Sequence, residues 1–61
     1  MDMSFEDCLS LIRRTASDLG VAPINIVETE IMRMVRFVAS DGTVMVTCSR
    51  LDGKAVITKS D

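Results

Sequence analysis

Two Asp-Gly dipeptides constrain the fold of this chain more than any other feature. Asp41-Gly42 and Asp52-Gly53 divide the segment from Met32 to Lys59 into three runs rich in apolar residues. An Asp-Gly pair between β-forming runs is the strongest short-range hairpin signal, because a two-residue type I′ turn needs positive φ at both central positions. Two such signals in series predict a three-stranded antiparallel meander, with strands at about 31–39, 43–50 and 54–59.

The segment that precedes these strands has the pattern of one amphipathic helix. Its apolar residues recur at spacings of three and four, which places them on one helical face. Ser4 is a typical N-cap, and Gly20 suits the left-handed residue that commonly ends a helix. We therefore expect a helix at about 5–19, packed on one face of the meander in an α+β fold of the order αβββ. The apolar positions are Phe5, Leu9, Ile12, Ala16 and Leu19.

Residues 21–31 allow more than one interpretation. Pro23 ends the helix, because it disfavours the helical conformation of the residue before it. Ile24 to Val27 alternate briefly in polarity and suit the start of a strand, and Glu28-Thr29-Glu30 suits a bend or bulge. A second helix is the alternative, because apolar residues also fit a helical period at Ile31, Met34, Val35 and Val38.

Placing each Asp-Gly pair in a two-residue turn sets the register of the meander. The expected pairs are Ala39–Val44, Phe37–Val46, Val35–Cys48, Leu51–Lys54, Ser49–Val56 and Cys48–Ile57. Because side chains alternate between the two faces of a strand, one face becomes almost wholly apolar and should pack on the helix. Arg33 and Arg50 are expected opposite each other near one end of that face.

The other face of the meander also keeps large apolar side chains, although the chain has no second helix to cover it. A solvated sheet face is normally mostly polar. Methionine side chains adapt to different surfaces and recur at binding sites, and an exposed apolar patch usually marks an interface. We therefore expect binding through this face, at Met32, Met34, Arg36, Val38, Met45, Leu51 and Val56.

The length of 61 residues predicts a single domain over 1–61 with a small core. One core of that size supplies at most about 3–5 kcal/mol, so a further stabilising element is expected. Cys8 and Cys48 are too few and too far apart to form a disulfide framework. We interpret them as buried free thiols, with a disulfide as the alternative. A homodimer, with the sheet face of one copy packed on the sheet face of the other, is then the favoured source of additional burial.

Patterns that carry catalysis or bind metals are missing from the sequence. There is no histidine, the only cysteines are two, and the three glycines all have turn or cap explanations. General acid–base pairs, nucleophilic dyads, phosphate-binding loops and zinc sites are therefore not expected. Glu28 and Glu30 are interpreted as solvated surface. The sequence predicts no enzyme activity, no cofactor and no metal.

The surroundings of the protein are also predicted from what the sequence lacks. No apolar run approaches the length of a membrane span, and no secretory signal follows the first methionine. With free thiols, these features predict the cytoplasm. We expect a non-catalytic protein–protein interaction module, homodimeric, that acts as an inhibitor or regulator by occupying a protein target. Small acidic proteins of this kind are often encoded by phages or mobile elements.

A nucleic-acid-binding regulator is the alternative function. Ala16, Gly20 and Ile26 have the spacing of a small residue, a turn glycine and a following apolar residue. This pattern resembles the middle of a helix-turn-helix. The resemblance implies a recognition helix from Ile24 to Met32 and a hairpin wing, although Glu28 would turn an acid toward phosphates. A basic sheet face is the other route, with Arg33, Arg36, Arg50, Lys54 and Lys59.

The edges of the meander suggest a third mode of action. Each outer strand has an unpaired edge that is protected only by its short length and by lysines. Such an edge can add to the sheet of a partner protein through backbone hydrogen bonds. The protein would then act as a subunit or adaptor.

Overall fold

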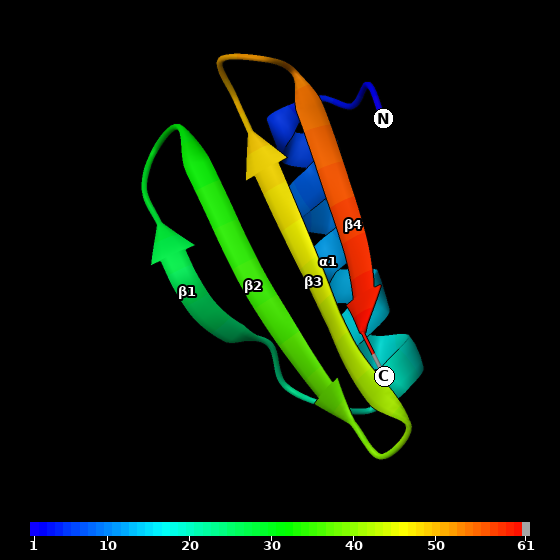
Figure 1. Cartoon of the computed structure of the whole chain (residues 1–61). Helices are drawn as coiled ribbons and strands as arrows, with labels where there is room; N and C mark the ends of the chain where they lie inside the picture. Colours follow the sequence, from blue (N-terminus) through cyan, green and yellow to red (C-terminus); the bar gives the residue numbers. More distant parts are fainter. Residues whose placement is uncertain (61) are drawn as a thin grey trace.

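The computed structural model describes residues 1–60 and has two layers. Helix α1 (Phe5–Leu19) is followed by strands β1 (Ile24–Glu28), β2 (Met32–Ala39), β3 (Gly42–Ser49) and β4 (Lys54–Ser60). The strands form one antiparallel sheet in the order β1-β2-β3-β4, and α1 lies behind β3 and β4 (Figure 1). The predicted α+β class is confirmed. The prediction of three strands is wrong, because β1 adds a fourth.

Helix α1 begins and ends at the predicted residues because both ends are encoded locally. The side chain of Ser4 accepts a hydrogen bond from the backbone N–H of Asp7 at 3.2 Å, which caps the first turn. Gly20 has a φ of 68°, and its N–H donates to the carbonyl of Ala16 at 2.9 Å. A left-handed residue at this position satisfies a helix-end carbonyl and turns the chain toward the sheet.

The segment with open alternatives forms strand β1. It pairs with β2, and a bulge interrupts the register between Asn25 and Val27. The turn that follows is closed by Thr29, whose hydroxyl oxygen accepts the backbone N–H of Met32 at 2.9 Å. The second helix and the recognition helix from Ile24 to Met32 are therefore wrong. Branched apolar side chains favour extended backbone here, and pairing with β2 satisfies the backbone polar groups.

Both hairpins differ from the predicted register by two residues. Ala39 pairs with Gly42, so that Ser40 and Asp41 form the first turn, and Ser49 pairs with Lys54, which leaves residues 50–53 as the second loop. The observed pairs in place of those predicted are Val38–Thr43, Phe37–Val44, Val35–Val46, Arg33–Cys48, Thr47–Val56 and Cys48–Ala55. Since two is an even number, every strand side chain keeps its predicted face.

Local geometry explains why the Asp-Gly pairs do not form two-residue turns. No non-glycine residue in 1–60 has a positive φ, so Asp41 does not adopt the conformation that a type I′ turn requires. The second loop is held instead by the side chain of Ser49. Its Oγ donates to the Asp52 carboxylate at 3.2 Å and accepts the Asp52 backbone N–H at 3.4 Å. These bonds stabilise a longer loop.

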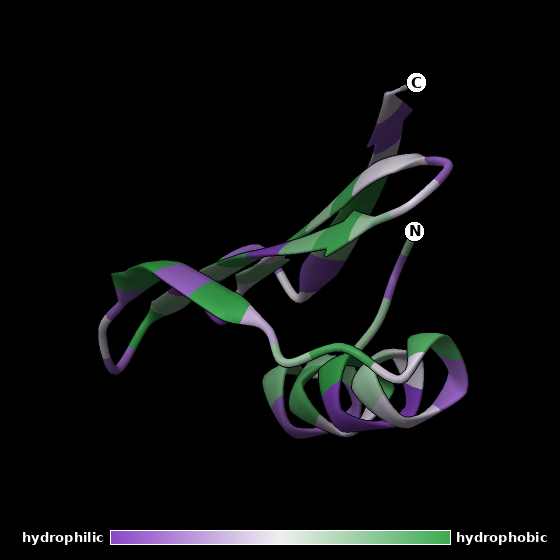
Figure 2. Cartoon of the chain, turned by 90° about the horizontal axis from the view of Figure 1, so that it is seen from below, coloured by the Kyte–Doolittle hydropathy of each residue, from purple (hydrophilic) through white to green (hydrophobic). Residues whose placement is uncertain are grey.

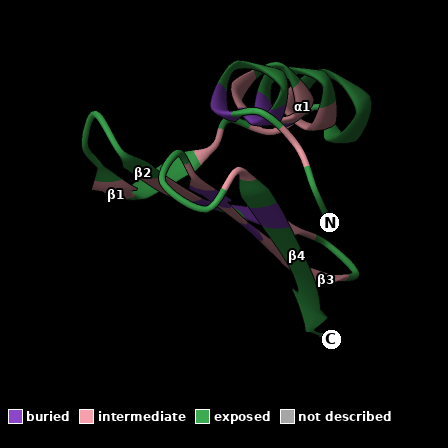
Figure 3. Cartoon of the chain, turned by 90° about the horizontal axis from the view of Figure 1, so that it is seen from above, coloured by how far each residue is buried: buried purple, intermediate pink, exposed green. Residues whose placement is uncertain are grey.

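The core lies between α1 and the face of the sheet that α1 covers, here called the inner face. Its buried side chains are Phe5, Cys8, Ile12, Val35, Phe37, Val46, Cys48 and Ala55. Within residues 1–60, α1 packs against β2, β3 and β4 but not against β1. Figure 2 shows that the sheet extends beyond the helix, and Figure 3 shows the buried residues gathered where the two layers meet. The core is thus confined to the middle of the molecule.

A disulfide joins Cys8 of α1 to Cys48 of β3. The interpretation of the two cysteines as free thiols is therefore wrong. Sequence separation says nothing about distance, and the fold brings their Cα atoms to 5.9 Å, within the range that a disulfide spans. The bond crosses the core and closes a loop with a separation of 40 residues. It provides a stabilising element of the kind that a small core needs.

Candidate interaction surface

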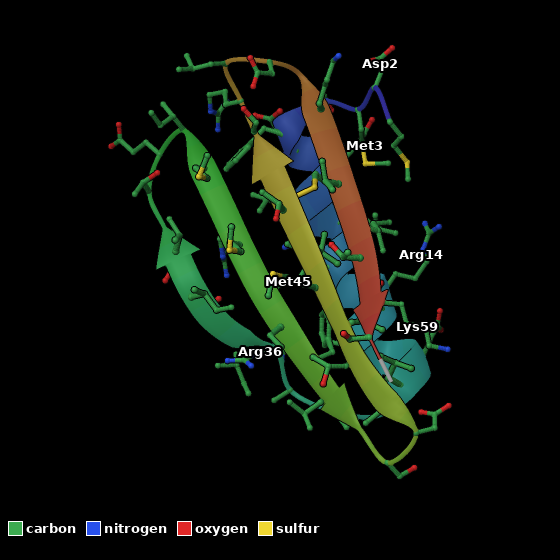
Figure 4. The ribbon with its side chains drawn as sticks, in the orientation of Figure 1. Asp2, Met3, Arg14, Arg36, Met45 and Lys59 are labelled. Carbon is green, nitrogen blue, oxygen red and sulfur yellow. A yellow bond between two sulfur atoms is a disulfide. The ribbon has the colours of Figure 1, made fainter. Side chains whose placement is uncertain are left out.

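The face of the sheet directed away from α1 is not covered by any element within residues 1–60. We call it the outer face. Paired residues on neighbouring strands point to the same side, so the face consists of rows that run across the sheet. One row contains Val27, Met34, Thr47 and Val56, and the next contains Ile24, Arg36, Met45 and Thr58. Figure 4 looks onto this face, with Met45 over β3 and Arg36 beside β1 and β2.

The structure brings the predicted binding residues together with one exception. Their strand positions and pairing place on the outer face Met32, Met34, Arg36, Val38, Met45 and Val56. Leu51 was expected opposite Lys54 at the end of a strand. It lies instead in the loop between β3 and β4 and is 77% exposed. The longer loop removes Leu51 from the paired surface.

Strand β1 contributes two outer-face residues that the sequence did not identify. Ile24 lies opposite Arg36, and Val27 lies opposite Met34. The brief alternation of Ile24 to Val27 was the available signal for a strand. It was weak because the bulge adds a residue and breaks the period of two.

Large apolar side chains on the outer face are accessible to solvent. Val38 is 52% exposed, Val56 is 57% exposed and Met32 is 38% exposed. Met34 and Met45 lie nearer the middle of the sheet and are half-buried by their neighbours. The pairing intersperses these apolar side chains with the hydroxyl residues Thr43, Thr47, Ser49 and Thr58, so the face is mixed, with an unusually large share of apolar residues for an uncovered sheet face.

Arg36 is the charged residue in the middle of this surface. Together with hydroxyl side chains and Lys59 it lines a shallow depression with a volume of about 390 Å³, formed by Arg36, Thr43, Met45, Thr58, Lys59 and Ser60. The ion pairs found within residues 1–60 involve Arg33 and Arg50 and leave Arg36 without one. No strand position of the outer face carries a carboxylate. The outer face thus combines apolar and hydroxyl side chains with positive charge, to which Lys54 adds opposite Ser49.

Arg33 and Arg50 are held away from the outer face. The prediction that they lie opposite each other is wrong, because Arg33 pairs with Cys48 and Arg50 lies in the loop after β3. Arg33 forms a 3.4 Å ion pair with Glu28 and donates to the Oδ1 of Asn25 at 3.1 Å. The basic sheet face that nucleic acid binding would use is therefore reduced by two arginines.

Arg50 connects the first turn of α1 to the loop between β1 and β2. Its guanidinium lies 4.4 Å from the centre of the Phe5 ring, donates to Glu6 Oε1 at 3.1 Å and donates to the carbonyl of Glu30 at 2.8 Å. A hydrogen bond from the backbone of Glu6 lowers the pKa of the Glu6 carboxyl, and the hydrogen bond and charge of Arg50 lower it further. This contact fixes the first turn of α1 over the loop.

Other kinds of site find little support in residues 1–60. No three histidine, cysteine, aspartate or glutamate side chains in this part of the chain are grouped to hold a metal ion. None of its helices combines the length and the apolarity needed to cross a membrane. Comparison with protein-family models, with curated proteins and with solved structures finds no match.

Proposed function

We propose that the protein is a small, non-catalytic protein–protein interaction module. In this proposal it acts as an inhibitor or regulator by covering a surface of its target with the outer face. The observation that carries the proposal is the exposure of more than half of Val38 and Val56 on a face with no covering element in residues 1–60. Large apolar side chains that stay exposed on an uncovered sheet face often mark a binding surface.

Arg36 supports a target that carries an acidic group among apolar ones. Burying a guanidinium costs free energy unless a partner with opposite charge accepts its hydrogen bonds. A carboxylate is the best match, because it can accept two parallel hydrogen bonds from the guanidinium. The neighbouring hydroxyls of Thr43 and Thr58 line the same depression and supply further donors. The surface therefore favours an acidic and apolar protein target.

Nucleic acid binding through a basic sheet face is the second proposal. The depression next to Arg36 and Lys59 supports it, because two cations and several hydroxyls suit a phosphate group. The net charge of −2 opposes it. The engagement of Arg33 by Glu28 and of Arg50 by Glu6 opposes it as well. Protein binding is the better supported of the two.

The proposal includes a cytoplasmic location and an origin in a phage or mobile element. The disulfide between Cys8 and Cys48 weakens the argument for the cytoplasm, since that argument used free thiols. Disulfides persist mainly in oxidising compartments. The oxidation state of the two cysteines in protein taken from its native cells would test the location.

Site-specific photocrosslinking in the native cells tests the proposed docking. A photoreactive amino acid is placed at Val38 on the outer face and, as a matched control, at Arg13 on the exposed surface of α1. We expect one discrete protein adduct from position 38 and none from position 13. The adduct should disappear when Val56→Glu is added. Equal labelling from both positions would refute docking through the outer face.

A further inference from the structure

The two edges of the sheet differ in their protection against pairing with another strand. β1 follows Pro23 and contains the bulge between Asn25 and Val27, and both features disfavour the addition of a strand. β4 forms the other edge. Its pairing with β3 is regular from Ser49–Lys54 to Thr43–Ser60. A regular edge of this kind is a template for a further strand.

The N-terminal segment already uses the first part of the β4 edge. Asp2 forms an antiparallel bridge with Lys54. The backbone of Met1 exchanges two hydrogen bonds of 2.8 Å with that of Ala55, and the N–H of Met3 donates to the carbonyl of Gly53 at 2.9 Å. The N-terminal segment therefore pairs with the β4 edge as an added strand does, but only as far as Ala55.

The rest of the β4 edge is unoccupied within residues 1–60. The backbone groups of Ala55 point toward the N-terminal segment, so those of Ile57 and Lys59 point to the same side by the alternation of a strand. No backbone group in 1–60 outside the sheet ladder pairs with them. Residues 56–60 are all exposed, and even the inner-face residue Ile57 is 44% exposed. β4 thus presents free donors and acceptors on an accessible strand.

We infer that two copies of the protein pair through their β4 edges, antiparallel and related by a two-fold axis. The register places Thr58 opposite the partner's Thr58 and Ile57 opposite the partner's Lys59. In this register the outward groups of Ile57 and Lys59 form hydrogen-bonded pairs on both sides of the axis. A shift that places the two Lys59 side chains opposite each other would bring like charges together and is disfavoured.

The outer face is a poorer surface for self-association than the β4 edge. If two outer faces packed on each other, the Arg36 side chains of both copies would enter an apolar interface. The strand positions of the outer face offer no carboxylate to accept their hydrogen bonds. Uncompensated buried charge is strongly unfavourable. Edge-to-edge pairing leaves Arg36 exposed to solvent. A second copy is therefore expected to bind at the β4 edge and not at the outer face.

Edge pairing also doubles the area of the outer face that is available for docking. This argument rests on the proposed function. With strands about 4.8 Å apart and a rise of about 3.3 Å per residue, the outer face of four strands covers roughly 500 Å². A standard protein interface buries about 800 Å² on each partner. A two-fold axis perpendicular to the sheet keeps both outer faces on one side. The pair then presents roughly 1,000 Å², whereas one copy falls short.

Mass in solution gives the first test, with the full chain in its oxidised form. Sedimentation equilibrium should show a monomer–dimer equilibrium for the wild type. Lys59→Pro removes an outward N–H on each side of the axis without removing a bond to β3, and should weaken dimerisation by about thirtyfold. An unchanged disulfide and circular dichroism spectrum would show that the variant is folded. A wild-type monomer at millimolar concentration, or a dimer unaffected by Lys59→Pro, would overturn the inference.

Cysteine crosslinking gives the second test and identifies the interface. Thr58→Cys places a thiol next to the two-fold axis, whereas Thr47→Cys places one on the same outer face but on the interior strand β3. Mild oxidation should give a disulfide-linked dimer for Thr58→Cys only. Crosslinking through Thr47→Cys instead would indicate face-to-face packing and overturn edge pairing. A monomer that still forms the adduct at position 38 would overturn the dimer but not the proposed docking.

Discussion

Reduction of the bond between Cys8 and Cys48 should remove much of the stability of this protein. The bond closes a loop with a sequence separation of 40 residues. The loop entropy that this closure removes from the unfolded chain is about 13 cal/mol/K, which corresponds to about 4 kcal/mol at 25 °C. A single core of this size supplies at most about 3–5 kcal/mol. The covalent link and the packed core are therefore expected to contribute comparable amounts.

Guanidinium unfolding of the oxidised and the reduced protein measures this contribution with the side-chain atoms conserved. With a dependence on denaturant of about 2 kcal/mol/M, a loss of about 4 kcal/mol lowers the midpoint by about 2 M. The variant Cys8→Ala/Cys48→Ala, treated with the same reductant, is the control and should not respond. A midpoint difference below about 0.5 M would refute the reasoning, because the bond would then constrain the unfolded chain far less than its loop length implies.

Three further outcomes follow from local features. Gly20→Ala should lower the free energy of unfolding by about 1 kcal/mol, because a residue with a Cβ is disfavoured in the left-handed conformation. The φ of 68° is strained for alanine, although its Cβ would meet no atom within 4 Å. An unchanged free energy of unfolding, measured with denaturant, would contradict this. The lowered pKa of Glu6 implies stability that is present above pH 4.5, the ordinary pKa of this carboxyl, and is lost as the pH falls through the folded pKa. Thermal melts should therefore show a smaller acid-induced loss for Glu6→Gln than for the wild type, and equal losses would count against stabilisation of the Glu6 carboxylate by its backbone hydrogen bond and by Arg50. A gel shift assay should detect no binding of duplex DNA or single-stranded RNA at low salt, and binding that strengthens as salt is removed would favour the nucleic acid proposal.

The hairpins were predictable from sequence, whereas their turns were not. Each Asp-Gly pair marks a reversal of the chain, but the number of residues in the reversal depends on contacts that form only in the fold. The bonds between Ser49 and Asp52 are such contacts. The predicted register was wrong by two residues in both hairpins. Because two is an even number, the prediction of which face each strand side chain lies on stayed correct. Leu51 was lost from the predicted surface because it left the strand for the loop.

Strand β1 and the disulfide were open alternatives in the sequence, and neither could be chosen, for different physical reasons. β1 is short, and the extra residue of its bulge breaks the alternation by which a half-buried strand is recognised. The disulfide depends on the distance between α1 and β3, which the docking of the helix determines. By contrast, α1 was predicted to its ends, since Ser4 and Gly20 encode both caps within the local sequence. Features set by neighbours in the chain were accessible, and features set by packing were not.

The order of elements in the chain has a consequence for synthesis of the protein. Each strand pairs with its neighbour in sequence, so the hairpins can form within microseconds once their residues are free. The helix is made first, but its core partners extend to Ala55, nearly the whole chain later. At about 5–20 residues per second, the ribosome needs about 2–10 s to cover that distance. Until Ala55 has been made, the core that α1 forms with the sheet is incomplete, and the disulfide cannot form before Cys48 follows Cys8 in synthesis.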